Sequence, residues 1–378
     1  MPSGIEWRYK AVKYSEKDLI SDMSYFNGND DKMQKKYQYN EIGEITDEKI
    51  YFSGYESQIL DLNTVIRVDN FLRTPYSIHM SYPSARSLYT LRLYFFKDGY
   101  LLTKDFWKRE EVLKAKSSIC VDSNISNGDI IIELKEFNDN HYPSIFKTLQ
   151  ILEVGHLLYN ISLIADIYGY EYELDNDSIN ILVLKNKKAG TNYLENNKTI
   201  EFWEKAQNRS SGKYYGGLIN FDLDYQKYAY SPKGTDETKS IKFNKNIMNS
   251  VKTLTFVNDG NALVDKNNGL VLYYGYIMKE YNYLNARTMS QITAFLYKWE
   301  KGMFVNYAEL IQYIGFLAQE VCINNSAVNV YNRPVKQMNF NFWLPIMKQN
   351  DIYEEYIPFY GILTGKESES ASTQRKTI

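Results

Sequence analysis

Cysteine is nearly absent from this sequence, and its scarcity excludes two ways of stabilising a fold. The cysteines are Cys120 and Cys322, which lie 322 − 120 = 202 positions apart. Two cysteines so placed cannot form a disulfide framework, and they lack the spacing of zinc ligands. Histidine is also rare, with only His79, His141 and His156. These scarcities argue against a structural metal and favour a reducing compartment.

The sequence also lacks an excess of charge and any long apolar run. It has 44 basic and 46 acidic residues, for a formal net charge of −2, which gives no general attraction to nucleic acid or anionic lipid. No apolar stretch approaches the roughly 20 residues needed to cross a bilayer. Residues 1–18 contain no apolar segment typical of a signal peptide. We therefore predict a cytoplasmic protein with no nucleic-acid or membrane partner.

What the sequence does contain is enough apolar residues for two domains. It has 378 residues, of which 44% are hydrophobic, and single domains usually hold about 100–200 residues. A polar stretch at 185–198, rich in Asn and Lys, marks the predicted boundary. The predicted division is an N-terminal extension (1–50), a first domain (51–190), a second domain (200–362) and a disordered tail (363–378).

A long buried helix is the clearest element of the first half. It is predicted to begin near Pro143, because apolar residues recur every three or four positions as far as Ile167, and Gly169 is well placed as its C-cap. Shorter helices are predicted at 16–25, 60–71, 201–207, 290–298 and 307–322, and strands at 88–96, 129–134, 171–174, 179–185, 253–257 and 270–277.

Two sequence patterns occur twice in the same order, which indicates a duplicated unit. The first copy has residues 83–91 followed by 153–160, and the second has 246–254 followed by 313–320. The distance from Leu91 to Gly155 is 155 − 91 = 64 positions, and that from Leu254 to Gly315 is 315 − 254 = 61. Similar spacing of two weak matches is better evidence of duplication than either match alone.

The residues of these patterns resemble the nitroreductase superfamily. Residues 83–94, PSARSLYTLRLY, resemble its loop-and-strand element, and especially that of SagB/McbC-type dehydrogenases. Residues 152–156, LEVGH, followed by Asn160, resemble a helix of the same family, and residues 315–319, GFLAQ, match that helix again. Residues 209–211, RSS, resemble the Arg-x-Ser segment that opens nitroreductase domains.

The resemblance implies an α+β fold with an antiparallel sheet flanked by helices. Members of the superfamily form tight dimers and hold FMN at the dimer interface. Two tandem domains would then form an intramolecular pseudo-dimer. SagB/McbC-type members oxidise azolines to thiazoles or oxazoles in a ribosomally made precursor peptide, beside a YcaO-type cyclodehydratase. A precursor peptide, such a cyclodehydratase complex and a second copy of the chain are the partners that the resemblance implies.

The two halves keep different parts of the predicted FMN site. The Arg-x-Ser match lies in the second half, whereas the Pro-Ser-Ala loop lies in the first, where the second offers only residues 246–248. A guanidinium and hydroxyl groups suit a flavin phosphate, and a tight loop can bring backbone N–H groups close to the flavin ring. We predict one FMN per chain. The predicted cofactor-binding residues are Arg209, Ser210, Ser211, Pro83, Ser84, Ala85, Gln319 and Arg333.

The catalytic prediction rests on a Lys-Tyr pair that the SagB/McbC family places fourteen positions before its helix glycine. At 155 − 14 = 141 this sequence has His141 and Tyr142, and at 315 − 14 = 301 it has Lys301. One half therefore keeps the tyrosine and the other keeps the lysine. Aromatising an azoline requires a base, and histidine can act as one near neutral pH. His141, Tyr142 and Lys301 are the predicted proton-transfer residues.

Other interpretations of the same residues stay open. The chain could be a catalytically degenerate scaffold that binds a peptide or a partner enzyme, or a small-molecule flavin reductase that uses NAD(P)H. Residues 209–211 could form a solvated loop, and residues 83–85 a plain turn. His156, on an apolar helix face, fits a core histidine, and Gly155 and Gly315 fit helix-packing glycines.

Overall fold

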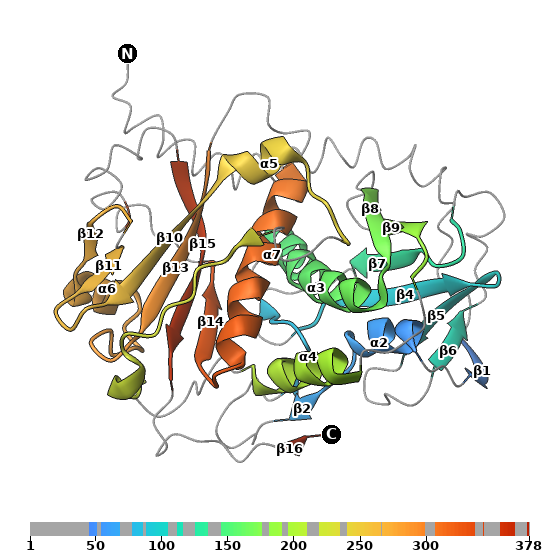
Figure 1. Cartoon of the computed structure of the whole chain (residues 1–378), viewed down its shortest axis with the longest axis horizontal. Helices are drawn as coiled ribbons and strands as arrows, with labels where there is room; N and C mark the ends of the chain where they lie inside the picture. Colours follow the sequence, from blue (N-terminus) through green and yellow to red (C-terminus); the bar gives the residue numbers. More distant parts are fainter. Residues whose placement is uncertain are drawn as a thin grey trace.

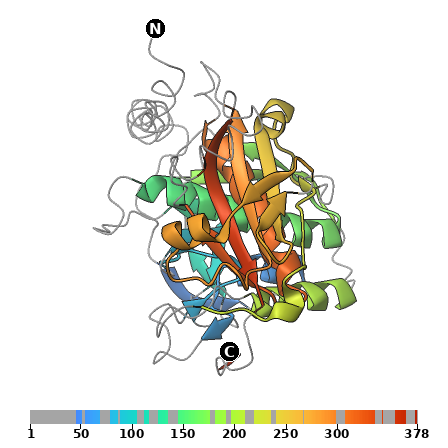
Figure 2. The same ribbon diagram turned by 90° about the vertical axis from the view of Figure 1, so that its left-hand side faces the viewer.

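The computed structural model shows two sheet-and-helix halves that meet along a central pair of helices (Figure 1). Turning the molecule by 90° brings the second sheet to the front, with the helices of the first half behind it (Figure 2). The structure describes residues 45–50, 54–68, 78–85, 88–104, 112–115, 125–134, 145–175, 181–190, 196–209, 219–234, 240–265, 267–298, 307–336, 343, 356–366 and 376–377.

The first half is built on a seven-stranded sheet with the order β1-β6-β5-β4-β7-β9-β8. All of its neighbouring strands pair antiparallel. The strands are β1 (Ile45–Ile50), β4 (Leu91–Lys97), β5 (Tyr100–Lys104), β6 (Val112–Ala115), β7 (Ile130–Leu134), β8 (Glu171–Asp175) and β9 (Ile181–Lys188).

The second half is built on a six-stranded sheet with the order β12-β11-β10-β13-β15-β14. Its neighbouring strands are also antiparallel. The strands are β10 (Val251–Asn258), β11 (Leu263–Asp265), β12 (Leu270–Leu272), β13 (Gln291–Lys298), β14 (Tyr331–Val335) and β15 (Tyr356–Gly365).

The two sheets share one arrangement of five strands. The order β5-β4-β7-β9-β8 in the first sheet corresponds, strand for strand along the chain, to β11-β10-β13-β15-β14 in the second. The central strands begin at Leu91 and Val251, which are 251 − 91 = 160 positions apart, and Gly155 and Gly315 have the same separation. The strand counterpart of Leu91 is therefore Val251 rather than Leu254. This correspondence supports the predicted duplication and pseudo-dimer.

Two long helices occupy equivalent places in the halves and form the centre of the molecule. Helix α3 (Phe146–Tyr168) follows β7, and α7 (Tyr307–Ser326) follows β13. Both are buried on nearly all sides because each packs on its own sheet and on the other helix. By length and hydropathy α3 could cross a membrane, but 83% of its apolar window is buried inside the fold, as expected of a core helix. Gly169 ends α3 in the left-handed conformation, with a φ of 75°, as predicted.

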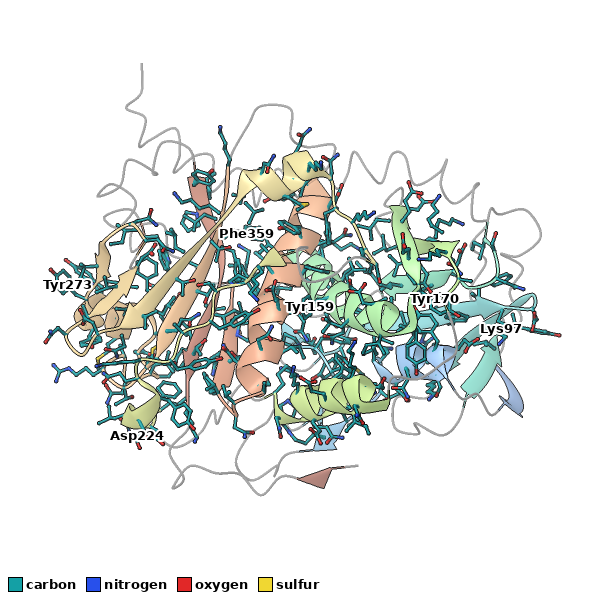
Figure 3. The ribbon with its side chains drawn as sticks, viewed as in Figure 1. Lys97, Tyr159, Tyr170, Asp224, Tyr273 and Phe359 are labelled. Carbon is teal, nitrogen blue, oxygen red and sulfur yellow. The ribbon has the colours of Figure 1, made fainter. Side chains whose placement is uncertain are left out.

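The crossing of α3 and α7 is a reciprocal contact between glycines. A Cβ atom on Gly155 would lie 2.1 Å from the backbone oxygen of Gln312, and one on Gly315 would lie 2.3 Å from that of Leu152. Leu152 and Gln312 are themselves 160 positions apart, so each helix uses the same pair of positions. Such self-complementary contact is the signature of a two-fold interface. Figure 3 shows Tyr159 beside this crossing, between the two helices.

The remaining elements connect the halves. Helix α4 lies beneath α3 and α7 in Figure 1 and packs against both, so the segment that opens the second half also covers the first. A small sheet with the order β16-β2-β3 lies below it. The elements are α2 (Tyr55–Asp61), α4 (Asn196–Asn208), α5 (Lys245–Ser250), α6 (Tyr274–Glu280), β2 (Arg67–Val68), β3 (Ile78–His79), β16 (Lys376–Thr377) and the 3-10 helix η3 (Leu223–Tyr225).

Three local predictions are wrong. Within residues 290–298, predicted as a helix, Gln291–Lys298 form the strand β13; the prediction failed because a short run that is buried on both faces does not reveal its period. Residues 270–277 form a strand only as far as Leu272 and then enter α6. The tail predicted as disordered begins inside β15, which continues to Gly365, and Lys376–Thr377 pairs with β2.

Other predictions have mixed outcomes. The structure confirms the long first helix, a helix within 307–322 and strands at 129–134 and 171–174. The helix predicted at 60–71 lies earlier, as α2, and the one predicted at 201–207 extends to Asn196–Asn208. The helix predicted at 16–25 lies outside the described residues. The proposed domain limits stay predictions.

Candidate functional site

A buried arginine of the second half holds the loop that precedes β4 in the first half. Arg209 directly follows α4, and its side chain is buried. Its Nη2 donates hydrogen bonds to the carbonyl oxygens of Met80 and Tyr82, both at 3.1 Å. Met80 and Tyr82 lie within three positions before Pro83. The structure therefore brings the predicted Arg-x-Ser segment against the predicted Pro-Ser-Ala loop, although more than a hundred residues separate them in sequence.

Arg67, on β2 of the first half, completes a reciprocal clasp. Its Nη1 donates to the carbonyl oxygens of Gln207 at 2.5 Å and of Arg209 at 2.7 Å. These carbonyls belong to the end of α4, where a helix leaves acceptors unsatisfied and favours a cation. Each half thus contributes a buried arginine to the backbone of the other. Arg67 was not among the predicted site residues, because no recognised motif contains it.

Both central helices hold a single peptide group of the same loop. The carbonyl oxygen of Ser81 accepts hydrogen bonds from Asn160 Nδ2 and Gln319 Nε2, each at 3.0 Å. Gln319 Nε2 also donates to Asn160 Oδ1 at 2.9 Å. Asn160 lies on α3 and Gln319 on α7, and both are fully buried. The loop is therefore fixed at the contact between the halves, which we call the seam.

His156 connects three elements across the seam. Its Nδ1 lies 3.1 Å from Gln319 Oε1, and its Nε2 lies 3.1 Å from the hydroxyl of Tyr360 on β15. Because the Gln319 oxygen can only accept, Nδ1 carries the proton and Nε2 accepts from Tyr360. The pKa of His156 is lowered to about 3, chiefly by burial; the Gln319 hydrogen bond opposes this shift, and the charge of Arg209 adds to it. His156 is thus a neutral core histidine at physiological pH.

This lowered pKa predicts a loss of stability in mild acid. The folded pKa of about 3 lies below the ordinary histidine value of 6.5, so the unfolded chain binds the proton first as the pH falls. Between pH 7 and pH 5 we expect His156 to cost up to about 2 kcal/mol of unfolding free energy. Urea unfolding at the two pH values measures it. His156→Phe, which copies Phe316 at the equivalent position, should show a smaller pH effect; an equal effect in both proteins would contradict the assignment.

A buried carboxylate on α3 ties the two ends of the Pro83 loop together. Glu153 Oε2 accepts from Ser84 Oγ at 2.8 Å, and Oε1 accepts from the backbone N–H of Thr90 at 3.0 Å. Thr90 Oγ1 donates to Oε2 at 3.3 Å. The N–H of Tyr89 donates to Ser84 Oγ at 2.9 Å. Glu153 occurs in the LEVGH motif, but sequence analysis gave it no role.

The second half has a comparable loop, which lies on α7. Glu320 Oε1 accepts from the N–H of Lys233 at 2.5 Å and from the hydroxyl of Tyr230 at 2.8 Å, while Oε2 accepts from the N–H of Gly234 at 2.9 Å. Glu320 is the 160-residue counterpart of Asn160. The loop contains Pro232, as the first contains Pro83. This loop has the same place on α7 as the Pro-Ser-Ala loop has on α3. Residues 246–248, which were predicted to have that place, belong to α5 instead.

The predicted site residues fall into three groups. Arg209 and Gln319 are buried at the seam, and Pro83, Ser84 and Ala85 are partly exposed next to it. Arg333 lies on β14, where its guanidinium is 4.4 Å above the ring of Tyr283. The predicted residues that lie outside the described part of the chain are Ser210, Ser211, His141, Tyr142 and Lys301.

The donors at the seam allow a test of the FMN prediction. Arg209 Nε is buried and has no hydrogen-bond partner among the described residues, and no carboxylate of those residues forms an ion pair with this guanidinium. A buried guanidinium donor without an acceptor fits an anionic group such as a phosphate. Ser84 Oγ and the Gln319 amide fit less well, because Glu153, Tyr89, Ser81, Asn160 and His156 use them. Within the described residues, no cluster of His, Cys, Asp and Glu could hold a metal.

Comparison with known proteins bears on the fold. No family model and no curated protein sequence matches the chain. The crystal structure of a protein from Anabaena variabilis, assigned as a nitroreductase, aligns with a TM-score of 0.55 at 14% identity, and covers 83% of this chain and 88% of that one.

Two other structures align over less than half of this chain. The Escherichia coli microcin synthetase McbBCD complex with truncated pro-MccB17 gives a TM-score of 0.27 at 8% identity, over 41% of this chain and 70% of that one. A Desulfovibrio desulfuricans protein assigned as a nitroreductase, in complex with FMN, gives a TM-score of 0.25 at 12% identity, over 47% of this chain and 92% of that one. These low scores carry no inference. The antiparallel sheets, their flanking helices and the Anabaena likeness together show that the chain has the nitroreductase-like α+β fold.

Proposed function

We propose that the chain is an FMN-dependent oxidoreductase that oxidises azolines to azoles in a ribosomally made peptide. The contact of Arg209 with the carbonyls of Met80 and Tyr82 carries this proposal. It joins the two motif segments of the resemblance, one from each half, at a two-fold-like seam. The sequence resemblance of residues 83–94 to the SagB/McbC-type dehydrogenases supports the substrate class.

In this proposal the protein's own residues bind and orient the cofactor. Arg209 offers its unpaired Nε–H to the phosphate, and the backbone of residues 83–85 faces the flavin ring. Bound FMN would supply the hydride acceptor. Ser84 and Gln319 support the loop rather than bind the cofactor, since their polar atoms have protein partners. Arg333 is not needed at this site, because it stacks on Tyr283.

The proton of the azoline requires a base other than His156. Because burial lowers the pKa of His156 to about 3, its neutral ring is too weak a base to take up a second proton near neutral pH in the folded chain. His141, Tyr142 and Lys301 therefore stay the proposed proton-transfer residues. Ser210 and Ser211 stay proposed phosphate ligands beside Arg209.

The two halves support one cofactor site rather than two. In the second half the N–H groups of Lys233 and Gly234 donate hydrogen bonds to Glu320, so these donors are not free to bind a cofactor. In the first half the corresponding helix residue, Asn160, donates to a carbonyl instead. The peptide groups of the two loops thus face α3 and α7 with opposite polarity, which favours one FMN per chain. The proposed partners are a precursor peptide, a YcaO-type cyclodehydratase and a second copy of the chain, in the cytoplasm.

A second candidate function is a scaffold without a cofactor. The polar atoms of Ser84 and Gln319 already form hydrogen bonds within the protein. A flavin would therefore have fewer side-chain donors than the motif resemblance implies, which favours a scaffold. A third candidate, an NAD(P)H-dependent flavin reductase of small molecules, would share the cofactor but differ in its electron donor.

Absorption spectroscopy separates these functions. Purified protein incubated with FMN and then freed of excess ligand should keep the visible bands of oxidised flavin. A folded but colourless protein would favour the scaffold. Bleaching of the bound flavin by NAD(P)H would favour the reductase, whereas a flavin reduced only by an azoline-containing peptide, with gain of the azole, would support the proposal.

A further inference from the structure

The loop beside the proposed cofactor site is held in a conformation that its own sequence disfavours. Tyr89 has a φ of 47°, a left-handed backbone that is costly for a bulky residue other than glycine. Tyr89 is also buried, with its hydroxyl accepting a hydrogen bond from the N–H of Met80 at 2.9 Å. Such a conformation persists only when surrounding contacts determine it.

Glu153 supplies those contacts. It accepts hydrogen bonds from Ser84 at one end of the loop and from both the N–H and the hydroxyl of Thr90 at the other. Through Ser84 Oγ it also fixes the N–H of Tyr89, the residue with the positive φ. A single carboxylate, 4% exposed, therefore holds Ser84 together with Tyr89 and Thr90.

The same residue is coupled to the seam. Glu153 lies on α3 two positions before Gly155, whose contact with α7 fixes the helix in place. The loop is anchored to Glu153 at residues 84 and 90, and to Arg209, Asn160 and Gln319 at residues 80–82. Both halves thus fix the beginning of the loop, Arg209 and Gln319 from the second and Asn160 from the first, and Glu153 holds its far end.

We propose that Glu153 is a positioning residue of the cofactor site, which holds the backbone of residues 83–85 in its flavin-facing conformation without touching the flavin. This inference rests on the proposed function. It assigns to Glu153 an effect on cofactor affinity that exceeds its effect on general stability. Removing the carboxylate frees the loop, so the binding-competent conformation becomes a minor one and the apparent dissociation constant rises in proportion.

Glu320 provides a matched control. It is also a buried carboxylate on a central helix, and it also accepts hydrogen bonds from at least three groups of a proline-containing loop, those of Tyr230, Lys233 and Gly234. The loop it holds has no part in the proposed site. Glu153→Ala and Glu320→Ala therefore remove comparable contacts, and only the first should affect FMN.

The experiment measures FMN affinity and amide exchange in the full chain. For Glu153→Ala we expect the FMN dissociation constant to rise about tenfold or more, with faster hydrogen exchange at the amides of Tyr89 and Thr90. For Glu320→Ala we expect a change within about twofold, with faster exchange at Lys233 and Gly234. Glu153→Gln keeps an acceptor for the Thr90 amide and should be intermediate, which covers the case in which the alanine variant does not fold.

Two results would overturn the positioning role. One is an equal loss of FMN affinity in the Glu153 and Glu320 variants, which would mean general destabilisation. The other is faster exchange at Tyr89 and Thr90 in Glu153→Gln or Glu153→Ala with unchanged FMN affinity. Failure of the wild-type chain to take up FMN is a different result, because it contradicts the proposed function itself.

Discussion

Replacing Gly155 with alanine is expected to lower the unfolding free energy by about 3 kcal/mol, at the upper end of the usual cost of overpacking. The added Cβ would lie 2.1 Å from the backbone oxygen of Gln312 and 2.9 Å from the Cα of Gly315. Both obstacles are backbone atoms, so no side chain can turn away and α3 must move from α7. Urea unfolding at neutral pH measures the loss.

Two further glycines make this prediction specific. Gly315→Ala meets the backbone oxygen of Leu152 at 2.3 Å and should cost a similar amount. Gly275→Ala, on α6, meets no atom within 4 Å and should be neutral or stabilising by up to about 1 kcal/mol, since alanine favours helices. If Gly155→Ala were as well tolerated as Gly275→Ala, the close helix crossing described above would be wrong.

Replacing Arg209 with lysine is expected to weaken FMN binding by about 10- to 100-fold, the value of a charge-assisted hydrogen bond of about 1.5–3 kcal/mol. Lysine keeps the charge but cannot reach two carbonyls and a phosphate with one planar fork. The Nη2 bonds to Met80 and Tyr82 would weaken, and the proposed hydrogen bond from Nε to the phosphate would be lost. Titration of FMN with fluorescence detection measures the affinity.

Arg287, an exposed arginine, provides the control for this substitution. Arg287→Lys should leave both FMN affinity and stability unchanged. Arg67→Lys should weaken FMN binding less than Arg209→Lys, because Arg67 contacts the backbone of Arg209 rather than the proposed ligand. Equal FMN affinity in Arg209→Lys and wild type would contradict the role proposed for Arg209.

Elements of the fold could be predicted from the sequence where a repeated motif or a regular spacing of apolar residues identified them. The stripe of apolar residues predicted α3, and the repeated helix motif predicted that Gly155 and Gly315 are equivalent. The period of β13 could not be read, because the strand is buried on both faces and so lacks a regular alternation of apolar and polar residues. The predicted equivalence of residues 246–248 with the Pro-Ser-Ala loop was wrong for another reason. These residues belong to α5, which precedes β10, and the loop that corresponds to the Pro83 loop comes earlier in the chain.

The candidate site was predictable only in its framework. The complementary motifs predicted that Arg209 would meet the loop at Pro83, and the structure brings them together. Arg67, Glu153 and Asn160 hold this arrangement, and each of them forms a hydrogen bond with a backbone group. Backbone partners leave no signature in sequence, so contacts of this kind become visible only when the chain is folded.

The most direct test of the account is the number of FMN molecules bound per chain. The wild-type chain, saturated with FMN and freed of excess ligand, is analysed by flavin absorbance against protein concentration and by native mass spectrometry. A single asymmetric site between Arg209 and the Pro83 loop predicts one FMN per chain. Two FMN per chain would contradict the asymmetry, and a folded chain that retains none would contradict the proposed cofactor.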